Sequence, residues 1–133
     1  MAEEQIENKR NNPEKIKGGK SKYYDTPIGK VQGTFEKLYI DNLLINNKTL
    51  PNIPKGIRTD NGLYFPDFEF QDRYIEIKSP FTYEIFEGKI AGFDKTTSTK
   101  QKEKLLWVSK NIKPVELIIL DKRGEILNSI YFD

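Results

Sequence analysis

The sequence predicts an α/β domain in which helices flank a small, central mixed β-sheet. Three observations support this prediction. Residues 33–48 have the apolar periodicity of a helix, residues 63–79 contain two short apolar strands, and residues 98–120 have the pattern of a second helix followed by a nearly continuous apolar strand. The chain has 133 residues, which is the length of one domain.

The first 32 residues are expected to form a basic, loosely ordered N-terminal arm, and residues 33–133 the folded domain. The arm is rich in lysine, asparagine and glutamate, a composition that buries little apolar surface. The helix that opens the domain has Thr34 as its expected N-cap. Its expected apolar face consists of Phe35, Leu38, Tyr39 and Leu43.

The two strands, residues 63–70 and 73–79, are expected to form a hairpin that turns at residues 71–72. In this register Asp67 lies opposite Glu76. Opposed residues share a face of the hairpin, and so do residues two apart, so Asp67, Glu76 and Lys78 are predicted to point the same way. The residues expected to face the core are Phe68, Phe70, Ile75 and Ile77.

The second half of the chain is predicted from the same signals. Residues 80–98 fit either a loop or short elements. The helix of residues 98–112 is expected to bury Leu105, Val108 and Ile112. The elements predicted after it are a strand covered on both faces, a turn and a last strand, at residues 114–120, 121–124 and 125–132.

Two missing residue types restrict the chemistry. The chain has no cysteine, which excludes disulfides and thiolate metal sites. It also has no histidine, which excludes imidazole bases and histidine-containing catalytic triads. Hydrolysis would therefore need carboxylates, lysine, tyrosine or a hard metal ion. The sequence lacks a long apolar segment and a leader-like N-terminus, so a cytoplasmic protein without membrane contact is expected.

Charge is distributed unevenly along the chain. Residues 9–22 hold six basic residues and one glutamate, and residues 88–113 hold seven lysines and two acids, so each segment has a net charge of +5. Residues 60–87 hold seven acids and two basic residues, a net charge of −5. An acidic centre between basic flanks suits a cation site that faces a polyanion, although a solvated surface of mixed charge fits the same counts.

The carboxylates of Asp67 and Glu76 indicate a metal site. Two carboxylates about 4 Å apart repel each other by roughly 4 kcal/mol at an effective dielectric constant near 20. A divalent cation with hard oxygen ligands, Mg²⁺ or Mn²⁺, would offset that repulsion. Glu36 lies at the edge of the apolar face of the first helix and is a candidate third ligand. The alternatives are a solvated polar face on the hairpin and, for Glu36, a first-turn glutamate favoured by the helix dipole.

These residues resemble a known signature. Pro66-Asp67 followed by Glu76-Ile77-Lys78 is similar to the motif of PD-(D/E)XK nucleases, and "GKVQGTFEKLYIDNLL" resembles the first helix of phage-type homing endonucleases in that superfamily. The resemblance covers roughly residues 24–120 and implies a small restriction-endonuclease-like fold. Ser79-Pro80 departs from the commonest pattern, in which a glycine follows the lysine.

The resemblance also implies roles for the residues. Asp67, Glu76 and the backbone carbonyl of Ile77 would bind Mg²⁺, for which Mn²⁺ can substitute, and Glu36 would bind the same ion, a second ion or a ligand water. Lys78 would position or help to deprotonate the attacking water. The implied activity is that of a Mg²⁺-dependent DNA endonuclease, with Glu36, Asp67, Glu76 and Lys78 as its catalytic residues.

DNA is the expected partner, and a double-strand break would need a homodimer or two binding events. The lysines expected to contact phosphates are Lys15, Lys17, Lys20, Lys22, Lys100, Lys102 and Lys104. Three alternatives stay open. They are a junction resolvase or repair nuclease on the same fold, a nucleic-acid-binding relative that does not cleave, and a scaffold protein.

Overall fold

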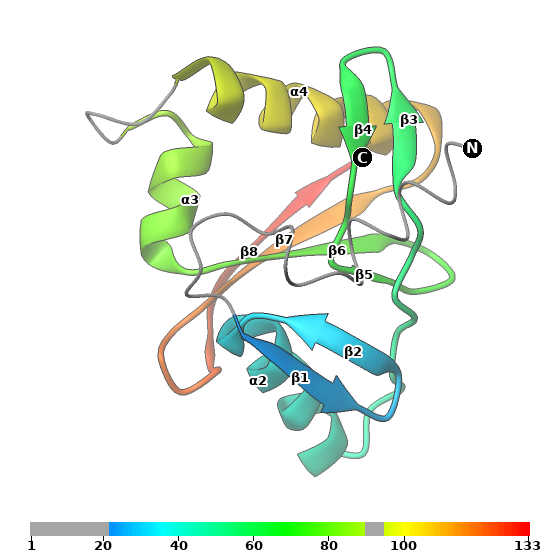
Figure 1. Ribbon diagram of the computed structural model, residues 1–133, viewed down its shortest axis with the longest axis vertical. Coiled ribbons are helices and arrows are strands. Elements are labelled where there is room, and N and C mark those ends of the chain that lie inside the picture. Colours follow the sequence, from blue (N-terminus) through cyan, green and yellow to red (C-terminus); the bar gives the residue numbers. More distant parts are fainter. Residues whose placement is uncertain (1–21, 90–94) are drawn as a thin grey trace.

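The computed structural model describes residues 22–89 and 95–133, which form an α/β arrangement of helices around a mixed sheet (Figure 1). The elements in chain order are β1 Tyr23–Thr26, β2 Gly29–Gln32, α2 Thr34–Ile45, β3 Ile57–Thr59, β4 Gly62–Tyr64, β5 Phe68–Glu69, β6 Tyr74–Lys78, α3 Pro80–Phe86, α4 Lys95–Asn111, β7 Val115–Leu120 and β8 Ile126–Phe132. None of the described helices is both long and apolar enough to cross a membrane.

The central sheet has the strand order β5-β6-β7-β8. Strands β6 and β7 are parallel, whereas the β5-β6 and β7-β8 pairs are antiparallel. A parallel pair needs a long crossover connection, and here α3 and α4 lie between β6 and β7 in the chain. The predicted α/β class with a central mixed sheet is therefore confirmed.

Apolar side chains cover the central sheet on both faces. One cluster joins α2 and the β1-β2 hairpin to Phe68, Ile75 and Ile77, with Phe70 packed against it. The second cluster joins α4 and α3 to the opposite face of β6 and β7. Alternate residues of β6 thus enter different clusters, as the predicted hairpin faces require.

The predicted hairpin register is confirmed, because Phe68 pairs with Ile75 and Glu69 with Tyr74. The predicted strand of residues 63–70 is wrong in its extent. Residues 62–64 form β4, which pairs with β3 in a separate hairpin, and β5 holds only residues 68–69. The break falls at Pro66, which has no N–H to donate to a ladder.

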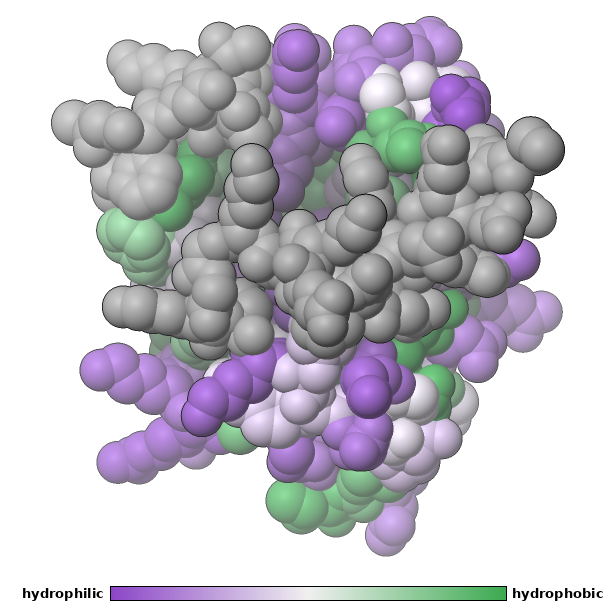
Figure 2. All heavy atoms as spheres, viewed as in Figure 1, coloured by the Kyte–Doolittle hydropathy of each residue, from purple (hydrophilic) through white to green (hydrophobic). Residues whose placement is uncertain are grey.

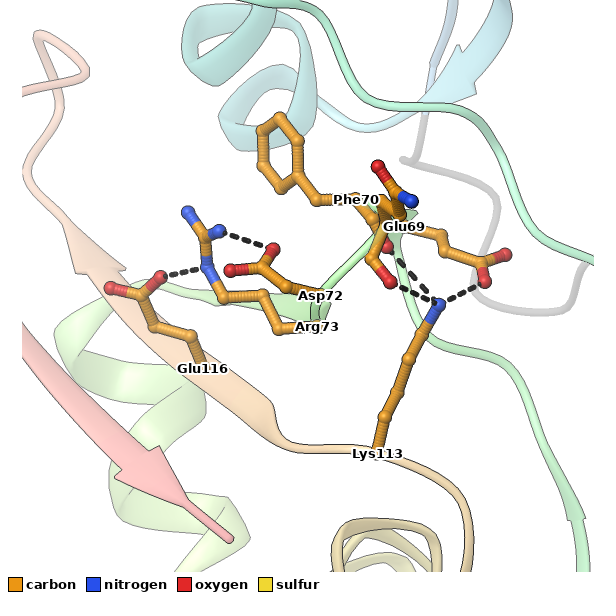
Figure 3. Close-up of polar contacts among 7 residues, drawn as sticks. Glu69, Phe70, Asp72, Arg73, Lys113 and Glu116 are labelled. Carbon is orange, nitrogen blue, oxygen red and sulfur yellow. Dashed lines mark hydrogen bonds and ion pairs between the residues drawn. The ribbon is translucent and has the colours of Figure 1, made fainter.

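The polar contacts of two basic residues, Lys113 and Arg73, stabilise the turn of the β5-β6 hairpin (Figure 3). Lys113 Nζ lies 2.5 Å from Glu69 Oε2 and donates to the Phe70 carbonyl oxygen at 3.1 Å. Arg73 donates to the carboxylates of Glu116 and Asp72, at 2.8 and 2.9 Å. The hairpin that carries the acidic motif is thereby tied to the chain around β7.

The ordered domain begins earlier than predicted. Residues 23–32 form the antiparallel β1-β2 hairpin, so the expectation of a loosely ordered arm is wrong for them. Val31 is buried and belongs to the cluster with α2, and this anchors the hairpin on the domain. Residues 1–21 of the predicted arm lie outside the described residues.

Gly33, rather than Thr34, is the N-cap of α2. Its φ of 93° is a conformation that favours glycine, and Thr34 is already the first helical residue. The Thr34 hydroxyl instead shares a 3.2 Å hydrogen bond with the Tyr24 hydroxyl. The chain therefore turns sharply from β2 into α2 at the residue before the helix.

Helix α3 lies in the segment whose sequence fits either a loop or short elements. Ser79 caps it, with its hydroxyl accepting from the Thr82 N–H at 3.1 Å, and Pro80 takes the first helical position. The Ser79-Pro80 departure from the motif is thus the start of a helix. Helix α4 ends at Asn111, so Ile112 is 48% exposed and its predicted burial is wrong, whereas Leu105 and Val108 are buried.

Candidate functional site

One cavity of about 530 Å³ holds the four predicted catalytic residues together in its lining. They come from three parts of the fold. Glu36 lies in the first turn of α2, Asp67 lies just before β5, and Glu76 and Lys78 lie on β6. Ile77, the predicted backbone ligand, also lines the cavity. The local hairpin register and the packing of α2 bring these side chains to one place.

Asp67 is fixed by the backbone of the neighbouring strand. Its Oδ2 accepts a 2.7 Å hydrogen bond from the Ile77 N–H, while its own N–H donates to the Ile75 carbonyl oxygen at 3.0 Å. Burial raises the pKa of Asp67 well above its usual value, and the charges of Glu76 and Glu36 raise it further. The Ile77 N–H and Lys78 act in the opposite direction without cancelling this rise.

Glu76 is a buried carboxylate, only 6% exposed, whose two oxygens have different neighbours. Oε1 accepts a 2.5 Å hydrogen bond from the hydroxyl of Tyr64. Oε2 lies 3.7 Å from Lys78 Nζ. A buried carboxylate needs such partners because its hydration has been removed.

Lys78 has a side chain that is 12% exposed and is held on several sides. Its Nζ donates to Gln101 Oε1 at 3.2 Å and lies 5.6 Å from the centre of the Phe86 ring. Gln101, on α4, accepts this hydrogen bond without adding a negative charge. The ammonium group is thus oriented at the cavity while it stays close to Glu76.

Glu36 has a pKa raised to about 7, mainly by burial and further by the charge of Glu76. A hydrogen bond from its own backbone N–H and the charge of Lys78 lower the pKa in part. The carboxylate folds back over the start of α2, since a Cβ at Gly33 would lie only 2.6 Å from Glu36 Oε2. Glycine at position 33 therefore makes room for the acid as well as the turn.

The donor set fits a hard divalent cation. Three carboxylates line the cavity with Lys78 beside them and the exposed Lys22 and Lys30 further out, and the negative charges that surround Glu36 and Asp67 contribute to the raised pKa of each. A cation would relieve this repulsion, and carboxylate oxygens are the ligands that Mg²⁺ and Mn²⁺ prefer. As the side chains lie, no three acids among residues 22–89 and 95–133 form a closed metal-binding cluster.

The predicted DNA-binding lysines have different surroundings. Lys15, Lys17 and Lys20 lie outside the described residues. Lys22 and Lys100 are exposed, and Lys22 lines the cavity. Lys102 forms a 2.7 Å ion pair with Glu87, with which a phosphate would have to compete. The stem of Lys104 lies beside Gly62, at the β3-β4 turn.

The sequence did not identify every residue of the site. Those it missed include Lys30, Gly33, Tyr64 and Gln101. Tyr64 reaches Glu76 from the β3-β4 hairpin and Gln101 reaches Lys78 from α4, so no spacing within the motif indicates them. For Gly33, the sequence did carry a signal, because this glycine directly precedes Thr34, the predicted N-cap.

On the face seen in Figure 2, the described residues are mostly hydrophilic and the apolar ones form separate patches. No known protein family, curated protein or solved structure matches the chain. An assignment of function therefore depends on the residues that surround the cavity.

Proposed function

We propose that the protein is a divalent-metal-dependent DNA endonuclease that hydrolyses phosphodiester bonds. The observation that carries this proposal is the convergence of Glu36, Asp67, Glu76 and Lys78 on one cavity. Carboxylates can hold the divalent ion that metal-assisted phosphodiester hydrolysis uses, and Lys78 lies beside them. They also occupy the positions that the PD-(D/E)XK resemblance implies, and we propose a phage homing type as the biological setting, in the cytoplasm of a bacterial or phage-infected cell.

Asp67 and Glu76 would hold the ion, together with the Ile77 carbonyl, and Glu36 would hold the ion or one of its waters. The backbone bond to Asp67 and the tyrosine bond to Glu76 restrict both carboxylates before an ion arrives. A bound Mg²⁺ supplies Lewis acidity and lowers the pKa of water.

Lys78 would orient the attacking water and offset negative charge on the phosphate. Gln101 and Glu76 both contact its ammonium group, which restricts the position of that group before the reaction begins. Glu36, with a pKa near 7, is able to take up a proton close to neutral pH.

DNA would approach across the mouth of the cavity. Lys22 and Lys30 are exposed lysines in its lining, contributed by the segment that leads into β1 and by β2. Their charge is opposite to that of the three acids in the same lining, so a phosphate group finds both a cationic contact and the acidic centre. This supports a polyanion as the substrate rather than a small neutral molecule.

The test is nicking of supercoiled plasmid DNA by the purified full chain with Mg²⁺, with and without a chelator. Glu76→Gln is expected to lower the cleavage rate at least 100-fold. Glu116→Gln is the matched control, since Glu116 also lies on the central sheet but accepts from Arg73 and Ser129 and does not line the cavity.

Equal cleavage by wild type and Glu76→Gln would overturn the assignment of the site. DNA binding with no cleavage of duplex or four-way junctions, with Mg²⁺ or Mn²⁺, would identify a relative that does not cleave. Preferential cleavage of four-way junctions would keep the chemistry and change the substrate to that of a resolvase.

A further inference from the structure

Tyr64 lies outside the acidic motif yet makes the closest polar contact with it. Its hydroxyl donates to Glu76 Oε1 at 2.5 Å, and both side chains are buried, at 3% and 6% exposure. Tyr64 ends β4 and reaches β6 because the β3-β4 hairpin packs beside α4. This tyrosine is twelve residues before the glutamate in the chain.

We infer that Tyr64 is a positioning residue that fixes the carboxylate of Glu76 for metal binding. This inference rests on the proposed function. With Oε1 held by the hydroxyl, the rotation of the carboxylate is restricted, and Oε2 is left on the side of Lys78. A carboxylate that is already oriented loses less freedom when it binds an ion.

A neutral hydroxyl suits this role better than a cationic donor. It satisfies a buried carboxylate oxygen without cancelling the negative charge that attracts a metal ion. A second lysine in its place would compete with the ion for the same charge. The phenol also comes from a different hairpin, so its position is independent of the turn between β5 and β6.

Another tyrosine provides a matched control. Tyr83 donates to Glu87 Oε1 at 2.9 Å, which is also a tyrosine–glutamate hydrogen bond, but neither residue lines the cavity. Tyr64→Phe and Tyr83→Phe each remove one hydroxyl and keep the ring. Only Tyr64→Phe removes a hydrogen bond to a proposed metal ligand.

The experiment is calorimetric titration of the full chain with Mn²⁺ alone, without DNA. Wild type and Tyr83→Phe are expected to bind with the same affinity, and Tyr64→Phe 10- to 100-fold more weakly, the usual effect of removing a partner of a metal ligand. In the Glu76→Gln background, Tyr64→Phe is expected to weaken binding less than threefold further, because its effect passes through Glu76.

Equal Mn²⁺ affinity of wild type and Tyr64→Phe would overturn the positioning role, and so would full additivity with Glu76→Gln. If wild type bound no Mn²⁺, the proposed function would fail and the role of Tyr64 with it. If Tyr64→Phe does not fold, the ring resonances of Tyr64 in the wild-type protein test the inference instead. Mg²⁺ is expected to shift the Tyr64 ring resonances at saturating concentration and leave those of Tyr83 in place, whereas unmoved Tyr64 resonances would contradict the inference.

Discussion

Buried negative charge is the main property of the site at the scale of single residues. Glu36 and Asp67 have raised pKa values because burial removes their hydration, and the neighbouring acids add repulsion. A group whose pKa is raised on folding favours the folded state most below its unfolded value, and this contribution disappears as the pH rises through the folded value. For Glu36 the pKa window runs from 4.5 to about 7.

The raised pKa of Glu36 gives a prediction for how the stability of the metal-free protein changes with pH. Its unfolding temperature is expected to fall between about pH 4.5 and 7.5 relative to that of Glu36→Gln, because ionised Glu36 is penalised only in wild type. Added Mg²⁺ is expected to restore the wild-type value at about pH 7.5, and its affinity to rise with pH as protons leave the ligands. Thermal unfolding at several pH values checks this. Parallel curves for the two proteins would show that Glu36 is not held in a destabilising environment.

Lys78 is expected to act in the chemical step. Lys78→Met should lower the nicking rate by about 10²–10⁴-fold, the range for removal of a positioned proton-transfer group, and leave the DNA affinity within about threefold. Lys102→Met is the control, because Lys102 pairs with Glu87. Quench-flow cleavage and fluorescence anisotropy measure the two effects. If the Lys78→Met protein cut DNA at the wild-type rate, Lys78 would have no role in the chemical step.

At the scale of elements, the start of α2 combines backbone conformation with the site. Gly33 has a positive φ, and a Cβ there would come within 2.6 Å of the Glu36 carboxylate. Gly88 also has a positive φ, of 74°, but a Cβ there meets nothing within 4 Å. An alanine at either position would strain the backbone, but only an alanine at position 33 would also displace the Glu36 carboxylate.

Gly33→Ala and Gly88→Ala are both expected to destabilise the fold, by about 1–2 kcal/mol for an alanine forced to a positive φ. Only Gly33→Ala should also weaken Mn²⁺ binding, by about as much as Glu36→Gln, since only there does the new methyl group push the carboxylate aside. Denaturant titration and calorimetry measure the two effects. Unchanged Mn²⁺ affinity in Gly33→Ala would remove Glu36 from the set of ligands.

The same scale shows which parts of the site are encoded locally. Alternation of apolar and polar residues specifies the register of β5 and β6, so the common location of Asp67, Glu76 and Lys78 was predictable. The β3-β4 hairpin was not, because the apolar stretch interrupted at Pro66 has the pattern of a single strand. Tyr64 meets Glu76, and Gln101 meets Lys78, only through tertiary packing, which no local periodicity encodes.

At the scale of the whole molecule, the acidic centre of the sequence becomes a cavity next to exposed lysines. Net charge along the chain does not identify which lysines face it, because Lys102 is paired with Glu87 while Lys30 lines the cavity. The fold class was predictable from the order of the elements. The position of Lys22 and Lys30 beside the cavity was not predictable, because residues 23–32 lack the long apolar pattern of a buried element.

Replacing Lys22 and Lys30 together by glutamine is expected to weaken binding to all duplex sequences about equally. The slope of log affinity against log salt should decrease by about 0.9 for each phosphate that is no longer neutralised, or about 1.8 for the pair. Lys48→Gln with Lys122→Gln is the control, because both of these lysines are exposed and neither lines the cavity. Equal changes of slope in the two double variants would mean that DNA does not contact the side of the cavity that carries Lys22 and Lys30.

Diffraction from crystals soaked in Mn²⁺ tests the central claim most directly, because the anomalous signal of manganese locates the ion independently of activity. The predicted result is an anomalous peak in the cavity, contacted by the carboxylates of Asp67 and Glu76, with Glu36 in contact with the ion or with one of its waters. The contradicting result is a saturating soak that leaves this cavity without a peak while Asp67, Glu76 and Glu36 keep their metal-free positions.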